Sequence, residues 1–311
     1  MKKVYLLLAV LTGSLVIVQS CGSDDAPDSN FIPARDRALE APLSTAIIED
    51  YLATHFYNYE DFENPPVNFD YRIIFDTIAG DNSDKIALIN QVTSKTAVDR
   101  VAEGVTYDLY YLNVEQGGGK ESPNFPDIIT LTYEGIYINK EINTIPYTKL
   151  FDGSVVPVNF DLTAVVNGFQ DVIIEFNVAE EIIVNNDGTV GAVNPGIGAM
   201  FIPSGLGYYV NPPGGSTIPI YAQLIFTFSL YSFTVGDQDN DGVPSIVEDL
   251  NGNQLEEDDD TDEDGLPNYI DADDDNDGRP TSDEIEIDAD GNITYPDVDG
   301  DGIVDYLDSD S

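Results

Sequence analysis

The C-terminal quarter of the chain carries more negative charge than a protein segment can bury unaided. Residues 237–311 hold 29 Asp or Glu and one basic residue, Arg279, for a net charge of −28. The whole chain has a formal charge of −46 over 311 residues. Mutual repulsion keeps such a segment extended unless cations neutralise it. The region is therefore either a solvated acidic tail or a cation-dependent fold.

Four twelve-residue segments in this region share one pattern. "DQDNDGVPSIVE", "DTDEDGLPNYID", "DDDNDGRPTSDE" and "DVDGDGIVDYLD" are named here loops 1 to 4. Each has acids at its first, third, fifth and twelfth places and glycine at its sixth, which is the ligand spacing of a calcium loop. Acids at all four twelfth places would occur by chance at roughly 0.02. The predicted calcium ligands are Asp237, Asp239, Asp241, Glu248, Asp260, Asp262, Asp264, Asp271, Asp273, Asp275, Asp277, Glu284, Asp297, Asp299, Asp301 and Asp308.

The spacing of the loops excludes helix-flanked EF-hands. Only Ala272 separates Asp271 of loop 2 from Asp273 of loop 3, which leaves no room for two helices. The long-short-long spacing of the loop starts resembles thrombospondin type 3 repeats. That resemblance implies loops wound around calcium ions with little hydrophobic core. "DLNGN" at Asp249 and "DADGN" at Asp288 look like partial additional sites.

The first residues, "MKKVYLLLAVLTGSLVIVQSC", have the parts of a secretion signal. The apolar stretch is too short to span a bilayer comfortably. "VQSC" resembles a bacterial lipobox, apart from Gln19, and implies a signal peptide of residues 1–20 with lipid on Cys21. Cys21 is the only cysteine, and an ordinary cleaved signal with a free thiol is the alternative. Gly22 resembles a signal for outer-membrane sorting, and "SDD" resembles some surface-export signals.

A polar tether over residues 21–36 and a helical extension over 37–89 follow. Apolar residues fall at helical spacing between Asp36 and Tyr57 and predict an amphipathic helix, with Pro42 near its start. The single histidine, His55, lies on the apolar stripe. We interpret it as a packed ring because no metal-binding partners flank it.

From about residue 104 to 233 the chain reads as an antiparallel sheet. Short β-branched and aromatic runs such as "TYDLYYLNV", "DIITLTYEGIYI" and "AQLIFTFSLYSF" alternate with turn residues. One segment, Asp161 to Phe176, has helical spacing instead, with Asp161 as the N-cap. The predicted fold class is therefore α+β.

Five pieces of this region, in order, resemble the FKBP-type peptidyl-prolyl isomerases. They are "GVTYDLYYLNVEQGGGKESPNFPDIITLTYEGIY", "LFDGS", "NFDLTAVVNGFQD", "FIPSGLGYY" and "STIPIYAQLIFTFSL". The resemblance covers residues 90–236 and implies an antiparallel sheet wrapped around one helix, with a pocket for Pro-containing segments. The site residues that it implies are Tyr133, Phe151, Asp152, Phe160, Val165, Val166, Phe169, Tyr208, Ile218 and Phe226.

Three departures from the family pattern bear on activity. The chain has no tryptophan, so Phe169 takes the place of the usual pocket floor. Tyr209 replaces a glycine beside Tyr208, and extra residues lie between Tyr133 and Phe151 and around "EEIIVNNDGTVGAVNPG". A plain β-core role for the aromatics, and a turn role for Asp152 in "FDGS", are the alternatives.

Together these features predict a lipid-anchored envelope protein, held at the outer membrane, that isomerises prolyl bonds in exported proteins. Its expected partners are Pro-containing segments and, through Cys21, the membrane. A non-catalytic adhesion protein and a simple calcium buffer are the alternatives. Only 12 Lys and Arg occur in the chain, which argues against nucleic acid. No organic cofactor is expected, and calcium is expected in a structural role.

Overall fold

The computed structural model describes residues 33–138 and 148–311, and residues Arg35–Ser311 form one compact unit. The predicted signal peptide, Cys21, most of the predicted tether and part of the insertion before Phe151 lie outside the described residues. None of the helices in the described ranges is both long enough and apolar enough to cross a membrane.

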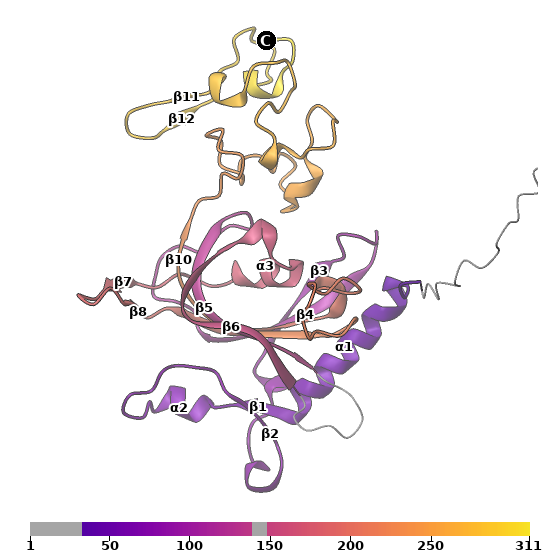
Figure 1. The fold of residues 1–311 in the computed structure, drawn as a ribbon, viewed down its shortest axis with the longest axis vertical. Coiled ribbons are helices and arrows are strands. Elements are labelled where there is room, and N and C mark those ends of the chain that lie inside the picture. Colours follow the sequence, from indigo (N-terminus) through magenta and orange to yellow (C-terminus); the bar gives the residue numbers. More distant parts are fainter. Residues whose placement is uncertain (1–32, 139–147) are drawn as a thin grey trace, which may run out of the picture. The chain divides into compact units, whose positions relative to one another are not determined.

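A six-stranded sheet forms the centre of the molecule, and all of its strand pairs are antiparallel (Figure 1). The strand order is β3-β4-β9-β10-β5-β6. The α+β class is therefore confirmed, and the helix α3 (Asn167–Ile173) packs on the sheet. The bounds are β3 (Thr93–Val98), β4 (Thr106–Glu115), β5 (Ile128–Ile138), β6 (Thr148–Asp161), β9 (Gly196–Ile202) and β10 (Leu224–Thr234).

Both faces of the sheet are covered. Every residue of β9 is buried. Successive side chains of a strand point to opposite faces, so both faces of β9 must be covered. Met200 and Ile202 pack in the cluster that contains Phe169 and Val172 of α3. Phe201, between them, packs on the other face in the cluster that contains residues of α1 (Arg37–Thr54). The predicted extension thus covers the face of the sheet opposite α3.

The segment predicted as one helix over 161–176 is interrupted. A 3₁₀ turn spans Leu162–Ala164 and α3 spans Asn167–Ile173. Val165 and Val166 between them are extended, with ψ of 171° and 141°. Two adjacent β-branched residues disfavour the helical backbone. Asp161 caps the 3₁₀ turn through Oδ1, which accepts from the Thr163 N–H at 2.9 Å.

The predicted N-terminal amphipathic helix is α1, and Asp36 caps it by accepting from the N–H groups of Ala38 and Leu39. Pro42 lies inside α1 rather than at its start, so the Ala38 carbonyl lacks its helical donor. His55 stacks on Tyr51 with ring centroids 3.9 Å apart, and burial lowers its pKa. The extension continues with β1 (His55–Tyr57), which pairs with β2 (Phe75–Thr77), and with α2 (Tyr59–Glu63).

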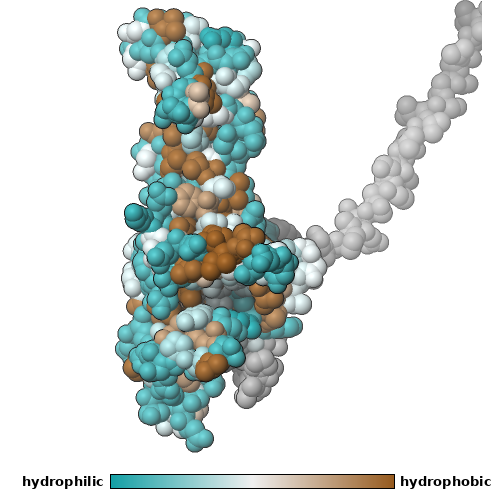
Figure 2. Space-filling view, turned by 90° about the vertical axis from the view of Figure 1, so that its left-hand side faces the viewer, coloured by the Kyte–Doolittle hydropathy of each residue, from teal (hydrophilic) through white to brown (hydrophobic). Residues whose placement is uncertain are grey.

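The residues around "EEIIVNNDGTVGAVNPG" form a projecting hairpin of β7 (Glu181–Val184) and β8 (Val190–Val193). All four residues of β7 are exposed. Figure 2, viewed from the hairpin side, shows apolar side chains gathered at its level.

The acidic region, named here the tail (residues 237–311), consists of turns, four 3₁₀ segments and the short pair β11 (Glu286–Ile287) and β12 (Ile293–Thr294). Its own apolar cluster is small and centres on Val243, Ile285 and Tyr306. The 3₁₀ segments of the described chain are Leu162–Ala164, Gly80–Asn82, Leu88–Asn90, Ser204–Leu206, Glu256–Asp258, Asn268–Ile270, Thr281–Asp283 and Asp305–Leu307.

Candidate functional sites: an aromatic cavity and four acidic loops

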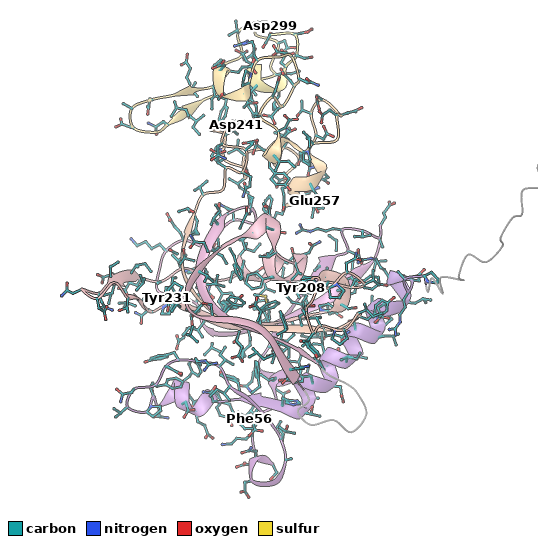
Figure 3. All side chains as sticks on the ribbon, viewed as in Figure 1. Phe56, Tyr208, Tyr231, Asp241, Glu257 and Asp299 are labelled. Carbon is teal, nitrogen blue, oxygen red and sulfur yellow. The ribbon has the colours of Figure 1, made fainter. Side chains whose placement is uncertain are left out.

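A cavity of about 500 Å³ lies between α3 with its preceding turn, strands β5, β6 and β10, and the loop that carries Tyr208. Figure 3 labels Tyr208. The structure brings nine of the ten predicted pocket residues to its lining. Ile218 does not line it and instead packs in the core, 6% exposed. The sequence did not predict three further lining residues, Asn159, Asp161 and Ala164. The lining comprises Tyr133, Phe151, Asp152, Asn159, Phe160, Asp161, Ala164, Val165, Val166, Phe169, Tyr208 and Phe226.

Aromatic rings meet edge to face in the cavity. The rings of Phe169 and Phe226 lie 5.2 Å apart at 89°, and those of Phe151 and Phe226 lie 5.5 Å apart at 88°. Phe160 contacts Phe169 in the same way at 5.8 Å. Gly135 of β5 makes this approach possible, since a Cβ there would lie 2.7 Å from Phe151 and 2.9 Å from Phe226. These contacts fix the shape of the apolar wall.

Asp152 and Tyr133 form the polar part of the lining. The Tyr133 hydroxyl donates to Asp152 Oδ2 at 2.6 Å, and the Gly153 N–H donates to Oδ1 at 2.9 Å. Asp152 lies inside β6 opposite Gly135, so the turn interpretation of "FDGS" is wrong. Burial and the neighbouring carboxylate raise the pKa of Tyr133 well above its usual range. Tyr133 therefore stays protonated and acts as a donor.

Two donor groups of the lining are unused by the described residues. The Tyr208 hydroxyl makes no hydrogen bond with any of them, and burial raises its pKa, so it too stays protonated. The Val166 N–H precedes α3 and donates to no carbonyl in the described ranges. Both groups are available to a ligand that enters the cavity.

Tyr209 turns to the N-terminal segment. Its φ of 51° lies in the left-handed region, which glycine adopts more readily than tyrosine. The Tyr209 hydroxyl donates to the Arg35 carbonyl, and the Arg37 guanidinium lies 4.2 Å above the ring. Arg37 also donates to Asp99 Oδ2 at 2.7 Å and to the Gly205 carbonyl at 3.1 Å. Arg37 thus fastens the Tyr208 loop to α1, a role that no sequence motif indicates.

Asp99 is the buried partner in this fastening. The Tyr107 hydroxyl donates to Oδ2 at 3.0 Å, and the N–H groups of Val101 and Ala102 donate to Oδ1 at 2.8 and 3.0 Å. Burial raises the pKa of Asp99, but the Arg37 hydrogen bond and these donors outweigh burial and lower it overall. Asp99 is therefore a charged anchor for Arg37.

The four acidic loops share one backbone conformation. The sixth residue of each loop, always glycine, has φ between 95° and 105°, as the calcium-loop pattern predicts. The fourth residue is also left-handed in all four loops, with φ from 56° to 79°. The residues concerned are Asn240, Gly242, Glu263, Gly265, Asn276, Gly278, Gly300 and Gly302.

Within each loop the first, third and fifth carboxylates converge, with ligand atoms within 4.8 Å of one another. The N–H of the seventh residue donates to Oδ1 of the fifth at 2.6 to 2.8 Å. The fifth N–H donates to Oδ1 of the third at 2.9 to 3.3 Å. The third and fifth carboxylates of each loop keep Oδ2 for a ligand, whereas Asp297, the first residue of loop 4, accepts at both oxygens.

A divalent cation fits this arrangement. Among the described residues, fourteen buried side-chain oxygens lack a hydrogen-bond partner, and all are carboxylate oxygens of the tail. Burial raises the pKa of Asp239 to about 7 and that of Glu248 to about 9. Buried carboxylates without a partner are costly, and calcium takes six to eight oxygens in flexible geometry. The residues that carry these oxygens are Asp237, Asp239, Asp241, Glu248, Glu256, Asp259, Asp260, Asp262, Asp273, Asp274, Asp275 and Glu284.

The closing acids of the loops behave differently from one another. Glu248 converges with Asp241 and also with Asp274, the second residue of loop 3, which sequence reasoning missed. Asp271, Glu284 and Asp308 join none of the convergent groups in the described ranges. Glu284 Oε1 lies 3.1 Å from Arg279 Nη1, an ion pair without hydrogen-bond geometry.

The ninth residue of each loop braces it, a role that the pattern search also missed. Ser245, Asn268, Thr281 and Asp305 are all at most 5% exposed. The side-chain oxygen of each accepts from the N–H of the second residue of its own loop, at 2.8 to 3.4 Å. The polar residue at the ninth place of every loop is the sequence feature that could have predicted this contact.

Asp249 and Asp288, which begin the predicted partial sites, join none of the convergent groups of three acids among the described residues. Asp249 accepts from the N–H groups of Asn253 and Gln254. Its contact with Gln254, the sixth residue, matches that of Asp260 with Gly265 in loop 2. Asp288 accepts from the N–H of Asn292 at 2.9 Å and from its side-chain amide, which lowers the pKa of Asp288. Metal binding by these two segments stays a prediction.

A family model and two solved structures are similar to parts of the chain. The model of the family described as BamM C-terminal matches residues 238–296, rather than a model of thrombospondin type 3 repeats. FkpA from Escherichia coli is 25% identical, over 41% of this chain and 48% of FkpA, with a TM-score of 0.31. A peptidyl-prolyl cis-trans isomerase from Pseudomonas syringae is 14% identical, over 65% and 99%, with a TM-score of 0.35. No curated protein matches the chain.

Proposed function

We propose that the cavity binds Pro-containing segments of exported proteins and catalyses their prolyl cis-trans isomerisation. The observation that carries this proposal is the composition of the lining. An edge-to-face set of aromatic rings stands beside the Tyr208 hydroxyl and the Val166 N–H, which no described residue uses. A concave apolar site with a few convergent polar groups is the usual form of a binding site.

The reaction needs no nucleophile. Rotation about a peptide bond has a barrier of about 18–20 kcal/mol because resonance makes the C–N bond partly double. The twisted amide has lost this resonance, so a dry, shaped cavity that fits the twisted form lowers the barrier. Phe169 and Phe226 would receive the proline ring. The Val166 N–H and the Tyr208 hydroxyl would hold the flanking carbonyls, and Tyr133 holds Asp152 in place.

A non-catalytic binder of Pro-containing segments is the second candidate. Phe169 stands where the FKBP family has tryptophan, and Phe226 packs against its ring at 5.2 Å. A smaller floor preserves an apolar pocket while changing the shape that must fit the twisted amide. Tyr209 does not bear on the choice between the two candidates, because it contacts Arg35 and Arg37.

We further propose that the tail binds calcium and that lipid on Cys21 holds the protein at the outer membrane of a bacterial envelope. The unpartnered buried oxygens support calcium. The lipobox-like residues support the anchor. In this arrangement the cavity would act on polypeptides after export, and the calcium-loaded tail would serve as a structural element.

The test is isomerisation of Xaa-Pro peptides by the full chain and by Tyr208→Phe, with Tyr231→Phe as the matched control. Tyr231 lies on β10 away from Tyr208 (Figure 3) and does not line the cavity. We expect catalysis by the unchanged protein and by Tyr231→Phe, and slower catalysis by Tyr208→Phe. Binding without acceleration would favour the non-catalytic candidate. Neither binding nor acceleration by the folded protein would reject both.

A further inference from the structure

Loop 1 and loop 3 meet in a cluster of three buried carboxylates. Ligand atoms of Asp241, Glu248 and Asp274 lie within 4.8 Å of one another (Figure 3 labels Asp241). The residues are 5%, 2% and 1% exposed. Asp241 and Glu248 belong to loop 1, whereas Asp274 is the second residue of loop 3. The ligand spacing that the four loops share does not account for Asp274.

The free oxygens in this cluster are held in place by hydrogen bonds to the opposite oxygens. Asp274 Oδ2 accepts from the Thr281 hydroxyl at 2.8 Å, while its Oδ1 is buried without a partner. Asp241 Oδ1 accepts from the Val243 N–H at 2.7 Å, while its Oδ2 is buried without a partner. Both carboxylates are therefore fixed with one oxygen unused.

Glu248 contributes two more free oxygens. Both are buried and neither accepts a hydrogen bond. The neighbouring Ser245 hydroxyl donates instead to Gln238 Oε1 at 2.5 Å. Three carboxylates thus meet away from water with four oxygens unsatisfied. No Lys, Arg or His among the described residues forms an ion pair with any of the three.

We propose that Asp274 is a ligand of the cation bound by loop 1, so that one calcium ion cross-links loop 1 to loop 3. This inference rests on the proposed calcium binding and extends it. Asp241 also converges with Asp237 and Asp239, so the ligands of loop 1 and Asp274 form one continuous set. An all-carboxylate set with a Glu able to bind through both oxygens matches the hard oxygen ligands that calcium takes.

The cross-link has a structural consequence. The ion would close the chain between Asp241 and Asp274 into a ring that contains loop 2. Val243 of loop 1 and Ile285, just after loop 3, already pack with Tyr306 of loop 4 in the apolar cluster of the tail. The small apolar cluster already joins loop 1 to the end of loop 3. The cation would join these two loops a second time, through bonds to carboxylates. The tail would then fold as one unit rather than as four independent loops.

Calcium titration of the full chain by calorimetry tests the proposal. The variants are Asp241→Asn, Asp274→Asn and the two together, with Asp283→Asn as the control. Asp283 lies in loop 3, is exposed and belongs to no convergent group. Its substitution makes the same charge change without removing a proposed ligand. Losing a ligand carboxylate should weaken one class of sites on the order of tenfold.

We expect Asp274→Asn to weaken the same class of sites as Asp241→Asn, and the double variant to weaken that class alone. Asp283→Asn should bind as the unchanged protein does. An unchanged isotherm for Asp274→Asn, or weakening of a class of sites that Asp241→Asn leaves unchanged, would overturn the cross-link alone. Absence of calcium binding by the unchanged protein would overturn the calcium proposal together with it.

Protease sensitivity gives a second readout. Calcium should protect residues 249–259, between loops 1 and 2, in the unchanged protein and in Asp283→Asn. Asp274→Asn should need on the order of tenfold more calcium for the same protection. Equal calcium dependence in all three proteins would contradict the cross-link.

Discussion

The aromatic cavity and the acidic loops satisfy their polar groups in different ways. In the cavity, rings pack against rings, and Asp152 receives hydrogen bonds from Tyr133 and Gly153. In the tail, fourteen buried carboxylate oxygens lack any hydrogen-bond partner among the described residues. The first region is held by apolar burial. In the second, the proposed calcium ions would supply the partners that these oxygens lack.

Removal of calcium should separate the two regions and have the largest effect of all. Chelation would leave the carboxylates of the tail unpaired, and their repulsion should unfold it, whereas the sheet has its own core. Hydrogen exchange with and without chelator would measure this. We expect loss of protection in residues 237–311 and little change in β5, β9 and β10. Equal loss in both regions would contradict the comparison.

Phe169→Ala should damage the sheet domain and leave the tail unaffected. Phe169 is 1% exposed and contacts Phe160 and Phe226. Its truncation should cost about 3–5 kcal/mol of the free energy of unfolding, because it opens a cavity in the core. Urea unfolding would measure the loss, and calcium titration should show unchanged affinity. A cost well below that of Phe169→Leu in the same experiment would be inconsistent with the packing described.

Arg37→Ala should have an intermediate effect. It leaves the buried Asp99 carboxylate without its ion pair, although Tyr107 and two backbone N–H groups still donate to it. We expect about 1–3 kcal/mol of lost stability and weaker substrate binding, because the Tyr208 loop loses its fastening. Arg72→Ala is the control, since the side chains of Arg72 and Glu134 are 55% and 38% exposed. It should cost about 0–1 kcal/mol.

Tyr133→Phe should have the smallest effect on stability. The hydroxyl donates to an exposed Asp152, so its loss should cost about 0.5–1.5 kcal/mol. The isomerisation rate should fall by a larger factor than this loss of stability alone would cause, because Asp152 is then held only by the Gly153 N–H. Comparison of isomerisation rates with urea midpoints would separate the two effects. A proportional loss in both would assign Tyr133 a purely structural role.

The sequence predicts the loops in more detail than the sheet domain. The left-handed sixth residues follow from the glycines, because each loop conformation is set within twelve residues. Asp274 was not predictable, since its meeting with Glu248 depends on how two loops pack together.

In the sheet domain, alternation predicts the long strands, and the family resemblance predicts most of the cavity lining. The break at Val165 and Val166 was missed because helical spacing persists on both sides of it. Ile218 lies in the core rather than at the cavity because the path of its loop depends on tertiary contacts. The contact of Arg37 with Tyr209 joins residues 172 positions apart, which no local pattern shows.

The most direct test of the account is the rate of Xaa-Pro isomerisation by the full chain, in saturating calcium and in excess chelator. The account predicts acceleration in both conditions, reduced in each by Tyr208→Phe, because no residue of the cavity lining belongs to the tail, where calcium is proposed to bind. Acceleration that requires calcium would contradict the independence of the two regions. A rate equal to the uncatalysed one, from protein shown to be folded, would contradict the isomerase itself.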